Sequence, residues 1–327
     1  MRKRITWIII ISVFLAAGAV TCALRWKAWF VNPPEPVWLG EEVDYHFHTF
    51  GQDSVPNFIN VGTTWYSLRD TDRLEILLLG DVHNHLSHER YQALGDLYPQ
   101  LDAYAQLGDW LDRGYAYYAE QLKSDLKGTL FESLPVMNTP GNHEYKKGLV
   151  KKLPNRWYSL FKHPLNGPTN SLGSTYYVDF CNLRWIVIDT SAPHLLHHFT
   201  RLNKWLKQTL RGAGDKFIVV IMHHPVYSHA KGRWNGRVFL YLVRSLREAD
   251  LVFSGHNHIY VRQLPFVETG SVHRPHRMKK GIHAEKISQQ PVYELLTVSA
   301  DSLLMRTYDL DTDSLFDEVT LFPSSNR

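Results

Sequence analysis

The sequence predicts an α/β fold, with the mixed character of the α+β class, built around a partly parallel sheet. Short apolar runs alternate with helical stretches along the middle of the chain, which is the pattern of parallel strands joined by helices. Two further strand-like runs, 176–180 and 183–188, flank Cys181 and Asn182 like a hairpin. We therefore expect a second sheet that is rich in antiparallel pairs.

The individual elements follow from the local pattern of apolar residues. The run 74–79 is short and nearly continuous, as expected for a strand buried on both faces. Strands are expected at 74–79, 103–107, 134–137, 176–180, 183–188, 217–222, 251–254, 259–264, 292–299 and 303–310, and a final apolar run lies at 315–322. Apolar periodicity predicts helices at 89–97, 115–126, 202–210 and 238–249.

Composition excludes several classes of protein. Hydrophobic residues make up 44% and charged residues 21% of the 327 residues, so the chain is not largely disordered. The net charge is +4, and Arg2, Lys3 and Arg4 supply three of these charges, so the body offers no electrostatic case for nucleic-acid binding. Of the two cysteines, Cys22 and Cys181, the first lies inside the apolar N-terminal segment, so we expect no disulfide. The two are not closely spaced, so any metal must be held by oxygen and nitrogen.

The N-terminus predicts a membrane segment. The run Ile5–Leu24 contains no charged residue and as a helix would cross about 30 Å of hydrocarbon. Residues 1–30 are therefore expected to form a single-pass anchor in the cell membrane, with the N-terminus cytoplasmic and the body extracytoplasmic. Small residues at 17–19 leave a cleaved signal peptide, and a secreted or periplasmic product, as the alternative. Residues 31–72 are expected to form a linker and N-terminal extension, and 73–327 the main domain.

Five polar clusters follow apolar runs in a fixed order. They are Gly80-Asp81-Val82-His83, Gly108-Asp109-Trp110-Leu111-Asp112, Gly141-Asn142-His143-Glu144, His223-His224-Pro225 and Gly255-His256-Asn257-His258. Because a strand's carboxyl end delivers such side chains to one shared edge of a sheet, we expect them to converge. Carboxylate, amide and imidazole groups are ligands for hard and borderline metals.

The types of side chain suit a pair of cations that clamps a phosphate. Asp81 and His83 stand two residues apart after a strand, where both can turn to one cation. Asp109 has two carboxylate oxygens and is expected to bridge the two ions. Asn142 offers a neutral amide oxygen where an anionic substrate must enter. Nitrogen ligands are expected from His223, His256 and His258.

The order of these motifs from Asp81 to His258 resembles that of the calcineurin-like metallophosphoesterase superfamily. The resemblance implies a four-layer α/β/β/α sandwich, in which helices cover two facing sheets, and metal-dependent hydrolysis of phosphoesters. By position, one metal is held by Asp81, His83, Asp109 and His258, and the other by Asp109, Asn142, His223 and His256. His143 is then expected to steady the transition state or protonate the leaving oxygen.

The identity of the two metal ions stays open between manganese (Mn), iron (Fe) and zinc (Zn), as divalent or mixed-valence ions. Gly-Asn-His-Glu is similar to the motif of purple acid phosphatases. Those enzymes, however, have a tyrosine ligand where Asp112 stands and a glycine-type residue where His83 stands. A purple iron site is therefore not expected, and Asp112 is expected to contact ligands rather than to be one.

Other histidines have weaker cases. His85, His88 and His224 stand beside ligand positions, and a contact with substrate is left open for them. His273, His276 and His283, with the basic residues between them, are expected to form a solvated basic loop at 273–283, with phosphate steering as the alternative. The expected partners are the membrane and a phosphoester substrate, either a small molecule or a lipid headgroup; nucleic acid is not expected. The alternative functions are a non-catalytic metal-binding scaffold of the same fold and a nuclease.

Overall fold

The computed structural model describes the greater part of the predicted main domain and two short strands before it. The described residues are 58–61, 64–67, 73–145, 153–154, 157–158, 161, 163–180, 182–192, 195–233, 240–272 and 274–323. The predicted anchor at 1–30 and both cysteines lie outside them. Within the described residues, no helix combines the length and apolar character that a membrane crossing requires.

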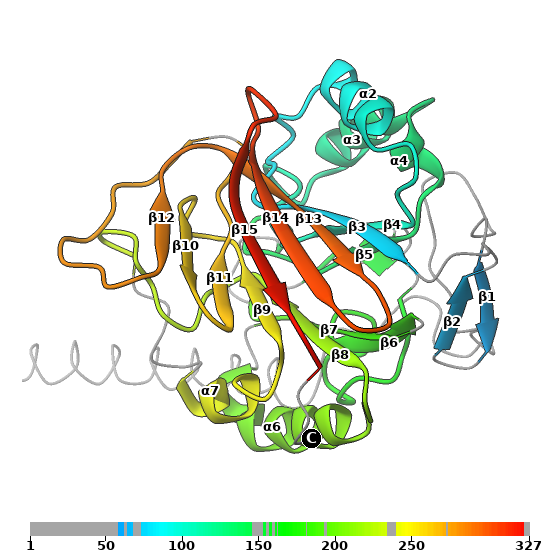
Figure 1. Cartoon of the computed structure of the whole chain (residues 1–327), viewed down its shortest axis with the longest axis vertical. Coiled ribbons are helices and arrows are strands. Elements are labelled where there is room, and N and C mark those ends of the chain that lie inside the picture. Colours follow the sequence, from blue (N-terminus) through cyan, green and yellow to red (C-terminus); the bar gives the residue numbers. More distant parts are fainter. Residues whose placement is uncertain are drawn as a thin grey trace, which may run out of the picture.

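Two β-sheets form the centre of the molecule (Figure 1). The nine-stranded sheet has the order β1 (Phe58–Val61), β2 (Thr64–Ser67), β6 (Tyr176–Phe180), β7 (Leu183–Ile188), β8 (Phe217–Met222), β9 (Leu251–Ser254), β11 (Phe266–Glu268), β10 (Tyr260–Gln263) and β12 (Lys286–Ser288). The six-stranded sheet has the order β15 (Leu315–Leu321), β14 (Leu303–Asp309), β13 (Val292–Val298), β3 (Leu74–Leu79), β4 (Ala103–Gln106) and β5 (Val136–Asn138).

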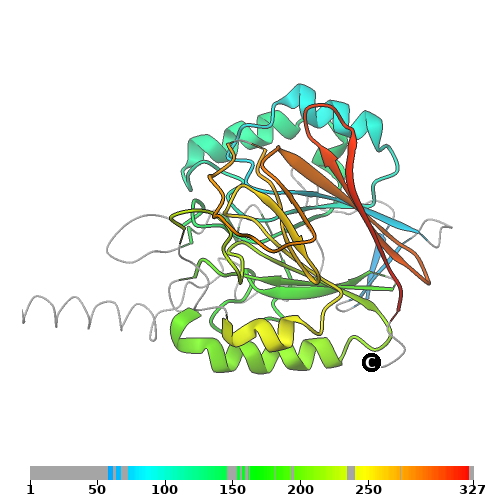
Figure 2. The same ribbon diagram turned by 60° about the vertical axis from the view of Figure 1, so that its left-hand side comes forward.

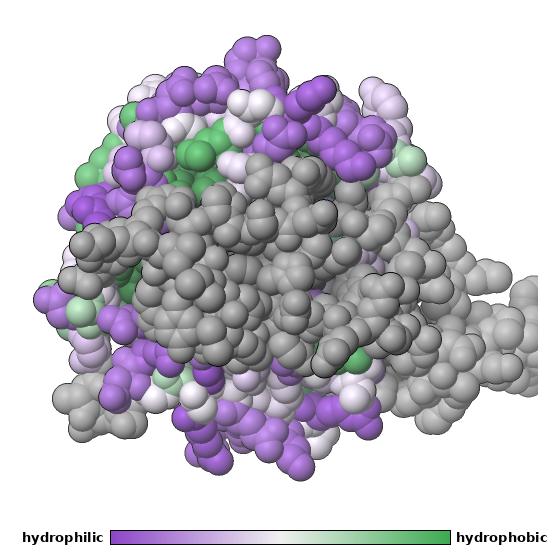
Figure 3. Space-filling model, turned by 90° about the vertical axis from the view of Figure 1, so that its right-hand side faces the viewer, coloured by the Kyte–Doolittle hydropathy of each residue, from purple (hydrophilic) through white to green (hydrophobic). Residues whose placement is uncertain are grey.

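Helices cover the outer face of each sheet. On the side of the six-stranded sheet lie α2 (His88–Leu97), α3 (Ala116–Leu126) and α4 (Leu130–Ser133), and on the side of the nine-stranded sheet lie α6 (Leu195–Arg211) and α7 (Leu240–Leu246). Figure 2 shows the sheets between the two helical layers. In Figure 3, hydrophilic residues gather along the upper and lower margins, where these helices face solvent. The mixed α/β sandwich with two sheets is therefore confirmed.

Strand β3 shows why its sequence has no polar face. Ile76 and Leu78 belong to the hydrophobic core between the two sheets, whereas Leu77 and Leu79 pack with residues of α2 and α3. Because successive side chains of a strand point to opposite faces, a strand between a sheet and a helical layer must be apolar at every position. Strand β8 repeats this arrangement: Val219 faces the other sheet, and Val220 packs with α6 and α7.

The pairing of the strands corrects one expectation. The predicted hairpin is present, since β6 and β7 pair antiparallel, and β3, β4 and β5 form the expected parallel run. The nine-stranded sheet, however, is mixed rather than rich in antiparallel pairs, because β7, β8, β9 and β11 run parallel. The helices α6 and α7 connect β7 to β8 and β8 to β9, and a helical crossover returns the chain in the same direction.

Short elements account for the other differences. The sequence analysis did not predict α4, β11 or β12, which have three or four residues each and are too short to show a period. Helix α6 begins seven residues earlier than predicted, at Leu195. The hairpin of β1 and β2 lies in the predicted N-terminal extension and extends the nine-stranded sheet, because β2 pairs parallel with β6. The domain boundary at residue 73 stays a prediction.

Candidate metal centre

The five polar clusters meet at one edge of the sandwich, as their position after apolar runs predicts. Asp81 follows β3 and Asp109 follows β4, so both extend from the six-stranded sheet. His223 follows β8 and His256 follows β9, and they extend from the nine-stranded sheet. The carboxyl ends of parallel strands in both sheets thus supply the side chains, as in other α/β folds.

One group of donor atoms surrounds Asp81. Its Oδ1 lies 3.4 Å from His258 Nε2 and 4.0 Å from His83 Nε2. The two imidazole nitrogens, His83 Nε2 and His258 Nε2, lie 3.4 Å apart. All three residues are buried, and their donor atoms lie within 4.8 Å of one another. These are three of the four residues that the resemblance assigns to the first metal.

A second group surrounds His223. Its Nε2 lies 3.2 Å from Asp109 Oδ2, 3.3 Å from Asn142 Oδ1 and 3.2 Å from His256 Nδ1. His223 is fully buried. The structure therefore brings together all four residues that the resemblance assigns to the second metal.

Asp109 connects the two groups. In addition to its contact with His223, its Oδ2 lies 3.9 Å from His83 Nε2, a member of the first group. Its other oxygen, Oδ1, accepts a hydrogen bond of 2.7 Å from the backbone N–H of His143. A single carboxylate oxygen thus faces nitrogen donors on both sides, which is the geometry required of a bridging ligand.

The residues present fit metal ions. His223 Nδ1 lies 2.9 Å from the carbonyl oxygen of Leu107, and His258 Nδ1 lies 2.7 Å from that of Arg274. Because a carbonyl only accepts, Nδ1 of each ring donates, and in the neutral ring the lone pair is on Nε2 and faces the cluster. Asp81 Oδ1 is buried without a hydrogen bond in the described part of the chain. Lone pairs that converge in this way need a cation between them.

The backbone at this edge is strained. The φ angles are 44° at Asp81, 49° at His83, 52° at Asp109, 68° at His256 and 53° at His258. Residues with a Cβ rarely adopt this left-handed conformation, which costs roughly 1–3 kcal/mol each and persists only where surrounding contacts hold it. Such strain often marks functional sites, and here it falls on five of the seven predicted ligands.

Without a metal, the histidines of the cluster differ in charge. Burial lowers the pKa of His83 to about 4 and the pKa of His256 well below its usual range, so both rings are neutral. Burial acts to raise the pKa of Asp109, but the neighbouring His223, His143 and His83 outweigh it, and the pKa of Asp109 is lowered. Burial opposes protonation of His223, but Asp109 raises the pKa of His223 to about 9, so without metal this ring is protonated at neutral pH and would release its Nε2 proton when a cation binds.

His143 is partly exposed, with 35% of its side chain accessible. Its Nδ1 lies 2.5 Å from the carbonyl oxygen of Asp112, and its Nε2 lies 3.9 Å from Asp109 Oδ2. A cavity of about 110 Å³ begins at this ring and is lined by Asp112, Arg113, Gly114, Tyr115, Asn142, His143 and Tyr145. The Asp112 carboxylate lies 3.9 Å from His83 Nδ1, so Asp112 contacts a predicted ligand.

Glu144 is a site residue that the sequence analysis did not assign. Its buried carboxylate accepts hydrogen bonds from the backbone N–H groups of Asp109 at 2.9 Å, Gly141 at 2.7 Å and Leu111 at 2.9 Å. It therefore joins two of the five clusters. The sequence could have indicated this role, because Glu144 ends the motif Gly-Asn-His-Glu. A carboxylate in a glycine-containing turn can accept hydrogen bonds from backbone N–H groups of the turn.

The basic loop is only partly solvated. Lys280 and His283 are exposed, as expected, and His273 lies outside the described residues. His276, in contrast, stacks on His258 with a distance of 4.2 Å between ring centroids. Its Nε2 lies 3.0 Å from Arg233 Nη2. The segment thus covers one side of the site, which charge alone could not indicate.

The remaining histidines differ in position. His224 lies beside the second group: its ring centroid is 4.4 Å from that of His256, and its Nδ1 is 3.1 Å from Thr190 Oγ1. His88 begins α2, where its Nδ1 contacts the carbonyl oxygen of Asp125 at 3.1 Å. His85 is exposed. Of these three, His224 alone lies among the groups of donor atoms in the described residues.

Comparison with protein-family models matches residues 74–260 to the model of calcineurin-like phosphoesterases. The chain belongs to the calcineurin-like phosphoesterase family. This match spans the strands β3 to β9 and all five clusters. The family whose motif order the sequence resembles is therefore confirmed.

Among relatives of this chain, a glycerophosphodiester phosphodiesterase GpdQ from Enterobacter lignolyticus is 31% identical over 132 residues, which are 38% of this chain and 45% of the relative. A purple acid phosphatase from Glycine max is 24% identical over 246 residues, 72% of this chain and 46% of the relative. The chain thus spans less than half the length of these two curated relatives.

Solved structures share the fold. The purple acid phosphatase PPD1 from yellow lupin has a TM-score of 0.54 at 13% identity, and the match covers 80% of this chain and 56% of that one. GAP50, described as the anchor in the inner membrane complex of Plasmodium, has a TM-score of 0.55 at 14% identity. This match covers 77% of this chain and 90% of that one.

Proposed function

We propose that this phosphoesterase hydrolyses phosphomonoesters or phosphodiesters with a dinuclear metal centre. Asp81, His83, Asp109 and His258 would hold one ion, and Asp109, Asn142, His223 and His256 the other. The observation that carries the proposal is the position of Asp109 Oδ2, which lies 3.2 Å from His223 Nε2 and 3.9 Å from His83 Nε2. A carboxylate between two groups of imidazoles suits two adjacent cations better than one.

When bound, the ions would polarise the phosphoryl group and activate water near neutral pH. The chain supplies the remaining chemistry. His143 lines the adjacent cavity, and its Nδ1 is held by the carbonyl oxygen of Asp112. In this orientation the imidazolium form of His143, which carries a proton on both nitrogens, can donate the Nε2 proton to the leaving oxygen of a substrate that enters from the cavity. Glu144 holds the turns that carry Asp109 and Asn142.

The proposal includes a location and a class of partner. The uncharged run Ile5–Leu24 supports a single-pass membrane anchor, and Arg2, Lys3 and Arg4 before it support an extracytoplasmic catalytic domain. A substrate at the membrane surface, such as a phosphoester of a lipid headgroup, fits this location, and a small soluble phosphoester fits the site equally.

Two alternatives make different predictions. A scaffold of this fold needs no complete set of donor atoms, whereas all seven predicted ligands and His143 are present and adjacent. A nuclease would require an electrostatic attraction to nucleic acid that the small net charge does not supply. The complete donor set therefore favours the hydrolase.

The test uses the purified full-length chain in detergent, loaded with manganese, iron or zinc. We expect turnover of p-nitrophenyl phosphate or bis-p-nitrophenyl phosphate with at least one metal, and near-complete loss of turnover and of one bound metal in Asp109→Ala. Loss of turnover with both metals retained would contradict the bridging role. Metal binding without turnover of any phosphoester would favour the scaffold, and digestion of single-stranded DNA would favour the nuclease.

A further inference from the structure

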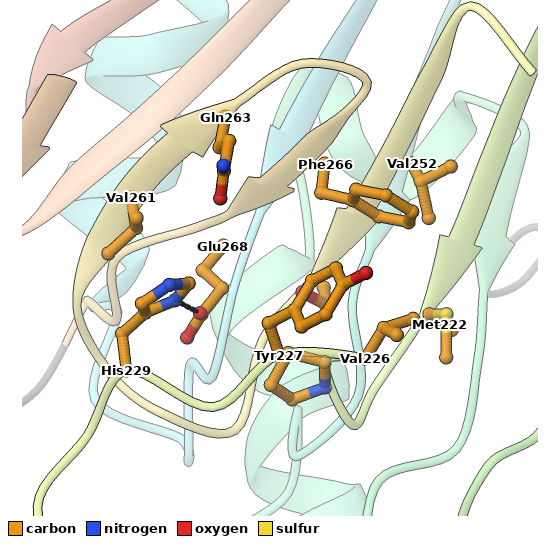
Figure 4. Close-up of a pocket in the computed structure, with 11 residues that line it drawn as sticks. Met222, Val226, Tyr227, His229, Val252, Val261, Gln263, Phe266 and Glu268 are labelled. Atoms are coloured by element: carbon orange, nitrogen blue, oxygen red, sulfur yellow. Dashed lines mark hydrogen bonds and ion pairs between the residues drawn. The ribbon is translucent and has the colours of Figure 1, made fainter. Parts of the chain in front are cut away.

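A buried carboxylate lies directly behind the turn that carries two predicted ligands. Glu268, the last residue of β11, is only 4% exposed. Its Oε1 contacts His229 Nδ1 and its Oε2 accepts a hydrogen bond from Asn257 Nδ2. Figure 4 shows Glu268 and His229 facing each other at one end of a pocket whose other walls include Val226 and Phe266. No sequence motif indicated this residue.

Asn257 connects Glu268 to the turn, because it lies between His256 and His258 and is fully buried. Besides its bond to Glu268, its Nδ2 lies 3.3 Å from Ser228 Oγ, and its carbonyl oxygen lies 3.0 Å from His276 Nδ1. The side chains of the two histidines face the donor cluster, while that of Asn257 is held on the opposite side. Glu268 thus holds the centre of the turn.

A second set of contacts leads from Glu268 to the same turn through His229. The carbonyl oxygen of His229 accepts a hydrogen bond of 2.8 Å from the backbone N–H of Lys279, and the N–H of Lys231 donates to the carbonyl oxygen of Arg277 at 2.6 Å. The same segment supplies the carbonyl oxygen of Arg274 that orients His258. Glu268 is therefore connected to His258 by two independent routes.

The turn needs this support because its backbone is strained. His256 and His258 have φ angles of 68° and 53°, which residues with a Cβ adopt only when neighbouring contacts compensate. If the carboxylate were removed, one N–H of the fully buried Asn257 amide would lose its acceptor, and a buried N–H without a partner is unfavourable. The turn would then be expected to relax, moving both imidazoles.

We propose that Glu268 is a positioning residue, which preorganises His256 and His258 to receive metal. This inference rests on the proposed dinuclear centre, because positioning has meaning only if the two histidines are ligands. Partners that orient metal ligands from behind typically change metal affinity by about 10–100-fold when they are replaced. We expect an effect of this size for Glu268→Gln, which keeps the volume but presents only one acceptor oxygen to two donors.

The experiment measures metal binding rather than turnover. Full-length wild-type protein and Glu268→Gln are stripped of metal and titrated with Mn²⁺ and with Zn²⁺ by calorimetry. The matched control is Asp179→Asn. Asp179 is also a buried carboxylate, bonded to Arg184 Nε at 2.7 Å, but it lies in β6 opposite Arg184, near the amino end of β7 and away from the site. We expect reduced stability in both variants and weaker metal binding only in Glu268→Gln.

Each outcome has one meaning. Two ions in the wild type and an affinity about 10–100-fold weaker in Glu268→Gln support the inference. Unchanged affinity in Glu268→Gln, with two ions in the wild type, overturns it and leaves the proposed function intact. Fewer than two ions in the wild type overturns the proposed function itself. If Glu268→Gln does not fold, Asn257→Ser decides in the same titration, because it removes the amide through which Glu268 holds the turn.

Discussion

Glu144 and Asp109 are joined by a buried hydrogen bond, in which the backbone N–H of Asp109 donates to Glu144 Oε2 at 2.9 Å. The same oxygen accepts from the N–H of Gly141, so one carboxylate holds the turns of two clusters together. Replacement by glutamine substitutes an N–H group for one of the acceptors that these amides face. The position of Asp109 therefore depends on Glu144.

We expect Glu144→Gln to bind metal about 10–100-fold more weakly and to lose turnover in proportion. Calorimetric titration and phosphoester assays over a range of metal concentrations measure the two effects. Turnover that returns to the wild-type level at high metal concentration identifies a role in metal retention. An unchanged affinity would contradict the role that the three hydrogen bonds assign to Glu144.

His143→Ala is expected to lower kcat by roughly 10²–10⁴-fold with metal content unchanged, because its ring lies beside the cluster without belonging to the predicted ligand set. The loss should be smaller for p-nitrophenyl esters than for alkyl esters, since a nitrophenolate leaves without a proton. Steady-state kinetics with both substrates and metal analysis check this. An equal loss with both esters would argue against proton donation by His143.

Gly141→Ala is expected to disrupt the site through its Cβ alone. An added Cβ would lie 2.2 Å from Asp109 Oδ1 and 2.3 Å from the Asp109 nitrogen, so the turn or the carboxylate must move. We expect loss of metal binding and destabilisation of about 1–3 kcal/mol. The control is Gly95→Ala in α2, where the nearest atom is Leu130 Cβ at 3.0 Å; metal affinity should not change there. Normal metal binding by Gly141→Ala would refute the prediction.

Glu294 predicts a pH dependence of stability that does not involve the site. Both of its carboxylate oxygens are buried without hydrogen bonds in the described structure, and burial raises the pKa of Glu294 from 4.5 to about 8. Between these values the unfolded chain loses the proton and the folded chain keeps it. This group therefore reduces stability as pH rises through that window, by up to about 1.4 kcal/mol per pH unit, and adds no further slope above it.

Glu294→Gln removes this contribution. The free energy of unfolding of the variant, relative to that of the wild type, should increase from pH 5 to pH 8. Urea denaturation at pH 5, 6.5 and 8 measures it. A difference that stays constant across this range would show that Glu294 does not hold its proton in the folded protein.

The sequence predicts those parts of the fold for which a pattern of residues has a single structural explanation. The run of β3 is apolar at nearly every position, which requires that both faces of the strand are buried. The polar residues that follow it therefore lie at the edge of the sheet. The direction of β8 and β9 within their sheet was less evident, because the apolar run of a buried strand does not reveal its partner. Their parallel pairing follows from the helices α6 and α7, which the sequence analysis predicted but did not connect to that sheet.

In the site, the predicted ligands were recognisable because each stands in a short motif. Glu268 and His276 have no such signal. Glu268 reaches Asn257 because β11 lies beside β9, an adjacency between a three-residue strand and a four-residue strand that no local pattern encodes. His276 reaches His258 because its segment pairs with residues 229–231. Both contacts are products of tertiary packing.

The predicted ligands come from both sheets. Asp81, His83 and Asp109 extend from the six-stranded sheet, and His223, His256 and His258 from the nine-stranded sheet. His83 and His258 are separated by 175 positions in the chain. Neither half of the polypeptide carries a complete donor set, so a bound cation would act as a cross-link that fastens one sheet to the other. Metal binding would add to the free energy of unfolding of the sandwich. Chelation would first weaken the contact between the two sheets at this edge.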